Sequence, residues 1–217
     1  MTIPELGWPR RTERLELRLP TDEAVDEVLR WRNHPDVTRW LLRTTVDPGS
    51  FRKAWLASVD DPLDHGVFVH LGDVVVGLAS LGVQDGLGQR EDGEPWRAAE
   101  GTLGYSFDPA YAGRGFATEV AGALLELGFT ELGLHRITAG CFAANTASAR
   151  VMEKLGMRRE QYGVRDSWHA ELGWIDGCQY GILAEEWTRA DRGVARLRRV
   201  SAPRVAPSGR ARPARPR

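Results

Sequence analysis

The stretch that decides the fold runs Phe107-Asp108-Pro109-Ala110-Tyr111-Ala112-Gly113-Arg114-Gly115-Phe116-Ala117-Thr118-Glu119. It predicts the end of a strand, a turn of small residues at 113–115 and the start of a helix. The first N–H groups of a helix have no partner within it, and the helix dipole adds partial positive charge there. Because glycines carry no Cβ, a pyrophosphate can approach the backbone of this turn closely. The stretch therefore predicts a phosphate-binding turn.

Two other phosphate motifs do not fit this chain. A Walker loop requires Gly followed by Lys, and the sequence contains no such pair. A dinucleotide fingerprint requires Gly or Ala where Thr118 stands, and an acidic residue at the end of the next strand. No acidic residue lies between Arg136 and Asn145. Both alternatives are rejected.

Outward from the turn, apolar periodicity predicts strands and helices in mixed order. The expected strands cover 15–19, 67–71, 74–83, 100–107, 136–142, 157–165 and 177–187. Helices are expected after the cap Thr21, near 48–59 after the cap Asp47, from 116, and at 146–155 before Gly156. Polar loops are expected at 84–97 and 166–176. This order predicts a single-domain α/β sandwich around one mixed, mainly antiparallel sheet.

Charge divides the chain into two parts. The 217 residues carry a formal net charge of −1. Residues 192–217 contain nine arginines and no Asp or Glu, which leaves −10 for residues 1–191. The basic segment lacks the apolar residues needed to offset its ordering entropy. We expect an acidic domain at 1–191 and a disordered basic C-terminal tail at 192–217.

Composition excludes several classes of protein. Apolar residues make up 42% of the chain, but no apolar run reaches 18 residues, so no transmembrane span and no membrane partner are expected. The N-terminus lacks a secretory pattern, and Cys141 and Cys178 cannot form a disulfide scaffold. These features favour the cytoplasm. The five histidines show no metal-ligand spacing, so no metal is expected.

A second motif runs Asn145-Thr146-Ala147-Ser148-Ala149-Arg150-Val151-Met152-Glu153-Lys154-Leu155-Gly156-Met157. Asn145 and Ser148 are about one helical turn apart, so both can face one bound ligand. Alternatively, Asn145 is only a helix N-cap and Ser148 a solvated serine. Beside the glycine turn, the ligand-facing interpretation is preferred.

Together, residues 103–160 resemble the acyl-CoA-binding core of the GCN5-related N-acetyltransferases (GNAT), particularly the RimJ/RimL branch that acetylates ribosomal-protein N-termini. The family's [QR]-x-x-G-x-[GA] turn corresponds to residues 112–117, where Ala112 departs from the usual Gln or Arg. The second motif is similar to the family's N-x-x-S-x-x-x-x-x-K-L-G-[FM] helix. Weaker likeness at 31–37 and 174–187 extends the resemblance to most of residues 13–188.

The resemblance implies a GNAT-like sandwich, acetyl-CoA as acyl donor and direct transfer to an amine in a ternary complex. Backbone N–H groups of the strand before the glycine turn would support the thioester. The coenzyme-binding residues that it implies are Tyr105, Ser106, Phe107, Ala112, Gly113, Arg114, Gly115, Phe116, Ala117, Thr118 and Asn145.

Thioester aminolysis needs a neutral amine, stabilisation of the carbonyl oxygen and a proton for the departing thiolate. Ser148, with Asn145 beside it, is the candidate proton donor. Glu100 is the candidate base, because it shares a strand face with Thr102 and Gly104. The alternative for Glu100 is a solvated carboxylate at a strand end.

Within this class, the resemblance favours the α-amine of a protein or peptide as acceptor. A small-molecule acceptor, such as an antibiotic or polyamine, is the alternative, and larger donors such as succinyl-CoA stay open. Trp96, Trp168 and Trp174 lie in the two expected loops, either as walls of an acceptor cleft or as core cover. A different class is a non-enzymatic module that presents the basic tail to nucleic acid. The same tail could hold an enzyme near ribosomal RNA.

Overall fold

The computed structural model describes residues 6–89, 93–190 and 198–199. Its strands are β1 (Arg10–Arg11), β2 (Glu16–Arg18), β3 (Asp64–Leu71), β4 (Val74–Gln84), β5 (Glu100–Phe107), β6 (Arg136–Phe142), β7 (Arg158–His169), β8 (Gly173–Leu183) and β9 (Arg198–Arg199). Its helices are α1 (Asp22–Arg32), α2 (Pro35–Thr38), α3 (Pro48–Ala57), α4 (Phe116–Thr130), α5 (Thr146–Lys154) and α6 (Ala184–Ala190). The strands form one sheet in the order β7-β8-β6-β5-β4-β3-β2-β1-β9.

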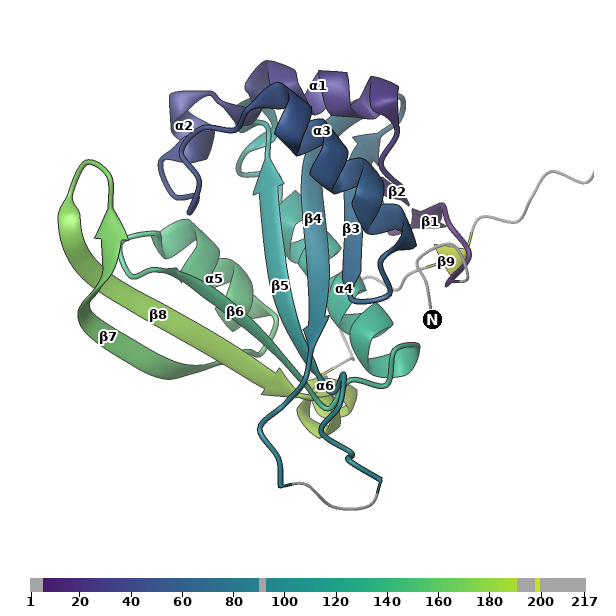
Figure 1. The fold of residues 1–217 in the computed structure, drawn as a ribbon, viewed down its shortest axis with the longest axis vertical. Coiled ribbons are helices and arrows are strands. Elements are labelled where there is room, and N and C mark those ends of the chain that lie inside the picture. The colour runs from purple at the N-terminus through teal and green to yellow at the C-terminus, as the bar shows by residue number, and fades with distance from the viewer. Residues whose placement is uncertain (1–5, 90–92, 191–197, 200–217) are drawn as a thin grey trace, which may run out of the picture.

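The expected α/β sandwich around a mixed, mainly antiparallel sheet is confirmed. Helices α1 and α3 lie over one face of β3–β5, and α4 covers the opposite face (Figure 1). The caps predicted from sequence are formed, since Thr21 accepts from the N–H of Ala24 and Asp47 from that of Ser50. Phe116, Val120, Leu124 and Leu127 of α4 are all buried in the main core.

The pairing of β5 with β6 is the one parallel contact among the described strands, and it is short. Only Glu100, Gly101 and Thr102 pair with β6, opposite residues 136–138. Beyond that point β5 continues to Phe107 and β6 to Phe142, and the two strands diverge (Figure 1). The parted strands leave an opening in the middle of the sheet.

The prediction of a loop at 166–176 is wrong, because this segment is part of a long hairpin. Strand β7 runs on to His169 and β8 begins at Gly173. Trp168 and Trp174 are directly opposite one another with edge-on rings 5.5 Å apart, a contact that stabilises paired strands. The Nδ1 atom of His169 closes the turn by accepting from the N–H groups of Glu171 and Leu172.

The strand expected at 177–187 ends early, at Leu183, where α6 begins. The carboxylate of Glu186 accepts from the N–H of Leu183 at 2.9 Å, so that an acidic residue in the first helical turn satisfies a backbone donor. Most of the expected disordered tail, 192–217, lies outside the described residues. Its described part, Arg198–Arg199, pairs with β1 as a short antiparallel strand, contrary to a wholly disordered tail.

Two histidines of β3 are buried in the protein. His65 is fully buried with no hydrogen-bond partner on either ring nitrogen, and Nδ1 of His70 is also unpartnered. Burial lowers the pKa of both imidazoles, and for His70 the charge of Arg18 adds to this effect. Both side chains are therefore neutral in the folded protein near neutral pH.

This burial predicts an acid-sensitive fold. Below about pH 6.5 the unfolded chain binds protons at these positions while the folded chain does not. Each unit by which the pH is lowered therefore reduces the free energy of unfolding by up to about 1.4 kcal/mol for each histidine. Urea unfolding at pH 7.5 and 5.5 measures the loss. His65→Met should reduce that loss, whereas His135→Gln, at an exposed position, should leave it unchanged. Equal losses in both variants would contradict the assignment to His65.

Candidate active site

A cavity of about 1420 Å³ occupies the opening between β5 and β6. Its walls come from β5, the glycine turn, β6, α5, the β7–β8 hairpin and the segment after α2. The sequence-predicted residues that line it are Tyr105, Ser106, Phe107, Ala112, Gly113, Arg114, Gly115, Phe116, Ala117, Thr118, Asn145 and Ser148. The structure thus brings every predicted site residue except Glu100 to one cavity.

Glu100 is placed elsewhere. It is the first residue of β5, about 16 Å along the strand from Tyr105 at the rise of an extended chain. Its carboxyl group lies beside Gly86, and its charge acts on Arg136 across the β5–β6 pair. Strand alternation predicts the face of a side chain but not its distance from the reacting atoms. In this structure Glu100 does not reach the cavity, in line with the alternative of a strand-end carboxylate.

The glycine turn has the geometry that a phosphate requires. Gly113 and Gly115 have φ angles of +75° and +80°, a region that favours glycine. Gly115 is the N-cap of α4 and offers no side chain to its first N–H groups. A Cβ on Gly113 would meet no atom within 4 Å, so the approach to the turn is open. The N-terminus of α4 therefore presents free donors and partial positive charge to the cavity.

An arginine remote in sequence holds this turn in place. Arg14 donates from Nη1 to the carbonyl oxygen of Arg114 at 2.9 Å, and its guanidinium stacks 4.8 Å from the ring of Phe116. Glu119 of α4, which is buried, accepts from the Nε and the backbone N–H of Arg14 and from the hydroxyl of Thr12. The sequence interpretation missed Arg14, because the contact spans about 100 residues. The signal in the sequence is Glu119, one of the two acidic residues of the largely apolar helix α4.

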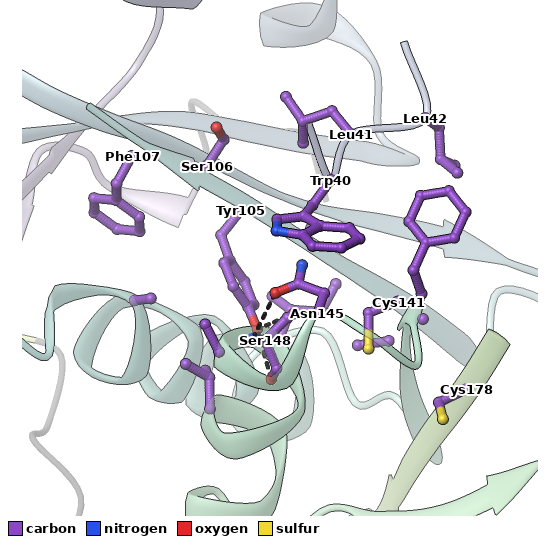
Figure 2. Close-up of a pocket in the computed structure, with 18 of the residues that line it drawn as sticks. Trp40, Leu41, Leu42, Tyr105, Ser106, Phe107, Cys141, Asn145, Ser148 and Cys178 are labelled. Carbon is purple, nitrogen blue, oxygen red and sulfur yellow. Dashed lines mark hydrogen bonds between the residues drawn. The ribbon is translucent and has the colours of Figure 1, made fainter. Parts of the chain in front are cut away.

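Asn145 and Ser148 lie together at the start of α5. Asn145 is the N-cap of α5 and accepts from the N–H of Ser148 at 3.1 Å, while both residues line the cavity. The Ser148 hydroxyl lies 2.9 Å from the phenol oxygen of Tyr105, as Figure 2 shows. Burial raises the pKa of Tyr105 to about 12, so this phenol stays protonated at neutral pH. The two hydroxyls form a hydrogen-bonded pair in which the phenol is protonated at neutral pH.

Aromatic side chains close the side of the cavity opposite the glycine turn. Trp40 lies over Asn145 in Figure 2, and its ring contacts those of Phe142 and His169. The Nε2 atom of His169 lies 2.7 Å from the carbonyl oxygen of Arg39, which fastens the segment after α2 to the hairpin. Trp168 lines the cavity, which is one of the two alternatives for it, whereas Trp96 donates from its indole N–H to the carbonyl of Gln89 in its own loop. Sequence reasoning did not identify Trp40.

Charge is divided across the cavity. The cationic lining residues are Arg114 at the glycine turn and Arg150 and Lys154 on α5. The acidic ones are Asp36, Asp64 and Asp166, on α2, β3 and β7. Anionic groups are therefore favoured near Arg114 and α5, and cationic groups near the three aspartates. Over the residues that the structure describes, no group of three His, Cys, Asp or Glu is placed to hold a metal ion, and no helix could span a membrane.

The clamp on the glycine turn is testable. Glu119→Gln removes the charge that orients Arg14, so we expect the dissociation constant for coenzyme A, measured by calorimetry, to rise roughly 10-fold or more. The control is Glu13→Gln, which removes an exposed carboxylate beside Arg14. Unchanged affinity in a folded Glu119→Gln protein, checked by its melting temperature, would refute the role of the clamp.

Comparison with known proteins agrees with this geometry. The family model for the acetyltransferase (GNAT) domain matches residues 14–158. The uncharacterized N-acetyltransferase YnaD of Bacillus subtilis is 46% identical over 85 residues, which is 39% of this chain and 49% of that protein. The uncharacterized N-acetyltransferase p20 of Bacillus licheniformis is 29% identical over 182 residues, 81% of this chain and 96% of that protein.

Solved structures extend the comparison. A GNAT-family acetyltransferase from Bacillus anthracis is 30% identical with a TM-score of 0.68, covering 82% of this chain and 100% of its own. RimJ of Mycobacterium smegmatis, solved with CoA-disulfide, shares the fold at 22% identity and a TM-score of 0.66, covering 86% and 94% of the two chains. With the family model spanning most of the described chain, this protein belongs to the GNAT acetyltransferases.

Proposed function

We propose that this acetyltransferase moves the acetyl group of acetyl-CoA directly onto the α-amine of a protein or peptide. The observation that carries the proposal is the Tyr105–Ser148 hydroxyl pair in the cavity between β5 and β6. In the described part of the chain, no carboxylate or imidazole forms a hydrogen bond with either hydroxyl. The reacting centre is therefore built to donate a proton and contains no base bonded to that donor.

Binding of the donor follows from the local geometry. The glycine turn and the N-terminus of α4 suit the pyrophosphate, with Arg114, Arg150 and Lys154 adding positive charge around it. Acetyl-CoA supplies an activated thioester carbonyl. The N–H of Asp108 donates to Val76 on β4, so alternation along this antiparallel pair directs the N–H groups of Tyr105 and Phe107 away from β4. These two N–H groups face the opening, where they can stabilise charge on the carbonyl oxygen.

The departing thiolate requires a proton, which Ser148 is placed to give. Its hydroxyl lines the cavity and is hydrogen-bonded to the Tyr105 phenol, which can replace the lost proton. The raised pKa of Tyr105 means that the pair holds its protons across the neutral range. Asn145 positions Ser148 by capping the helix that carries it.

The amine must lose its own proton, and this favours an α-amine. An α-amino group has a pKa near 7.7–8.0, so about a third is neutral at pH 7.5, whereas an alkyl amine of pKa about 10.4 is neutral in roughly one molecule in a thousand. Without a base at the centre, the weakly basic amine has the advantage. Carboxylates on the acceptor side of the cavity attract the charged form before it deprotonates.

Ser148→Ala tests the proton donor. We expect kcat to fall roughly 10- to 1000-fold with little change in coenzyme affinity, since acid catalysis acts in the transition state. Tyr105→Phe should lower kcat in the same direction. Thr146→Ala, at an exposed position on the same helix, is the matched control. Wild-type turnover by Ser148→Ala would show that Ser148 is not the proton donor and only packs in the structure.

The pH dependence tests the acceptor class. For a peptide α-amine, kcat/KM should rise about tenfold per pH unit and level off near pH 8; for a polyamine it should keep rising toward pH 10. Steady-state rates between pH 6 and 10 with both acceptors measure this. A common plateau near pH 7 for both would show that an enzyme base, and not the amine, controls the rate.

A further inference from the structure

A second cavity, of about 380 Å³, adjoins the first on the side of α1 and α3. The residues that line both are Leu41, Ser80, Gly104, Tyr105 and Ser106. In Figure 2, Leu41 and Ser106 lie near the backbone end of Tyr105, and Ser148 lies at its hydroxyl end. The residues of the glycine turn do not line this second cavity. It therefore extends the site from the reacting centre on the acceptor side.

Two arginines that form no ion pair with any residue the structure describes line the second cavity. Arg32 of α1 is only 7% exposed, and its Nη2 donates to the carbonyl oxygen of Arg43 at 3.1 Å. The Nη1 atom of Arg32 is buried with no hydrogen-bond partner. Burial and the nearby charge of Arg43 both lower the pKa of Arg32. The charge of Arg43 therefore acts on Arg32 as a like charge, and both residues line this cavity.

No described carboxylate compensates this charge. Asp47 also lines the second cavity, but its Oδ1 accepts from both the N–H and the hydroxyl of Ser50, each at 2.8 Å, as the cap of α3. Neither Arg32 nor Arg43 forms an ion pair with any carboxylate in the described ranges. A buried cation without a counter-ion is costly, and a guanidinium is the group best shaped to bind a carboxylate through two parallel hydrogen bonds.

We propose that Arg32 and Arg43 bind a carboxylate of the acceptor, placed so that its amine reaches the Tyr105–Ser148 pair. The preferred acceptor is then an amine with a carboxylate close by, a narrower class than the α-amine function on which this inference rests. Two sources share this chemistry: the acidic side chain of a peptide's first or second residue, and the α-carboxylate of a free amino acid.

Matched acceptor pairs test the site and identify the source. The pairs are the amidated peptides Ser-Glu-Ala-Gly and Ser-Gln-Ala-Gly, the amidated peptides Asp-Ala-Gly and Asn-Ala-Gly, and free serine against serinamide. Each rate is divided by the neutral fraction of that amine, so that amine pKa does not enter. We expect kcat/KM to be about tenfold or more higher for the carboxylate member of at least one pair, the gain of one charged hydrogen-bonded contact. The pair that responds names the source.

Variants assign the preference to the arginines. Arg43→Gln, at an exposed position, should remove the preference for the carboxylate acceptor by raising KM for that acceptor only. Arg32→Gln should do the same, provided that its melting temperature shows a folded protein. Arg30→Gln, on the exposed face of α1, should preserve it. Equal rates within all three pairs, or a preference that survives both cavity variants, would overturn the site while leaving α-amine transfer intact. No turnover with any of the six acceptors would reject the proposed function itself, and this site with it.

Discussion

The short pairing between β5 and β6 is the constraint on which the rest of the structure depends. After three residues of parallel contact the strands part, so backbone groups along the facing edges lose their strand partners. Each parted strand leads directly into a helix, β5 through the glycine turn into α4 and β6 through Asn145 into α5. Two helix N-termini therefore meet at one opening, where unpaired N–H donors are concentrated. A ligand rich in acceptor atoms suits such an opening, and a coenzyme with phosphates and a thioester carbonyl is one.

The sequence specified those parts of the fold whose signals are local. Caps at Thr21 and Asp47 and the left-handed glycines at 115 and 156 mark helix ends by chemistry within a few residues, and the predicted bounds of β5, β6 and α5 agree with the structure. The end of the β7–β8 hairpin, at 166–176, was expected to be a loop because its pairing depends on the contact of Trp168 with Trp174 across two strands. Tryptophan, glycine and charged residues without alternation are typical of a loop until that pairing is known.

The candidate site likewise contains residues that a local pattern predicts and residues that only long-range contacts bring to it. The glycine turn and the Asn145–Ser148 spacing lie within short segments and could be predicted as one ligand-facing region. Tyr105 was assigned only a backbone role, because its phenol meets Ser148 through a contact 43 residues apart. Trp40 lines the cavity and Arg14 holds the glycine turn. Both come from elements far from the motifs, and no pattern in their own segments marks them. For Glu100 the sequence indicated a face of β5, but position along the strand determined that it lies away from the cavity.

Charged side chains are distributed unevenly around the cavity, and its arginines differ in whether they are paired. Arg14 is paired with the buried Glu119, so it adds rigidity to the glycine turn and little net field. Arg114, Arg150 and Lys154 have no ion pair among the described residues, and they surround the end where helix N-termini already favour phosphates. The lining aspartates lie on other elements, α2, β3 and β7, so a cationic amine and an anionic donor are drawn to different parts of one cavity. In the proposed function, the reactive groups of the two substrates would meet between these parts, at Tyr105 and Ser148. The arrangement would then keep like charges apart in the proposed ternary complex, which favours the direct transfer proposed above.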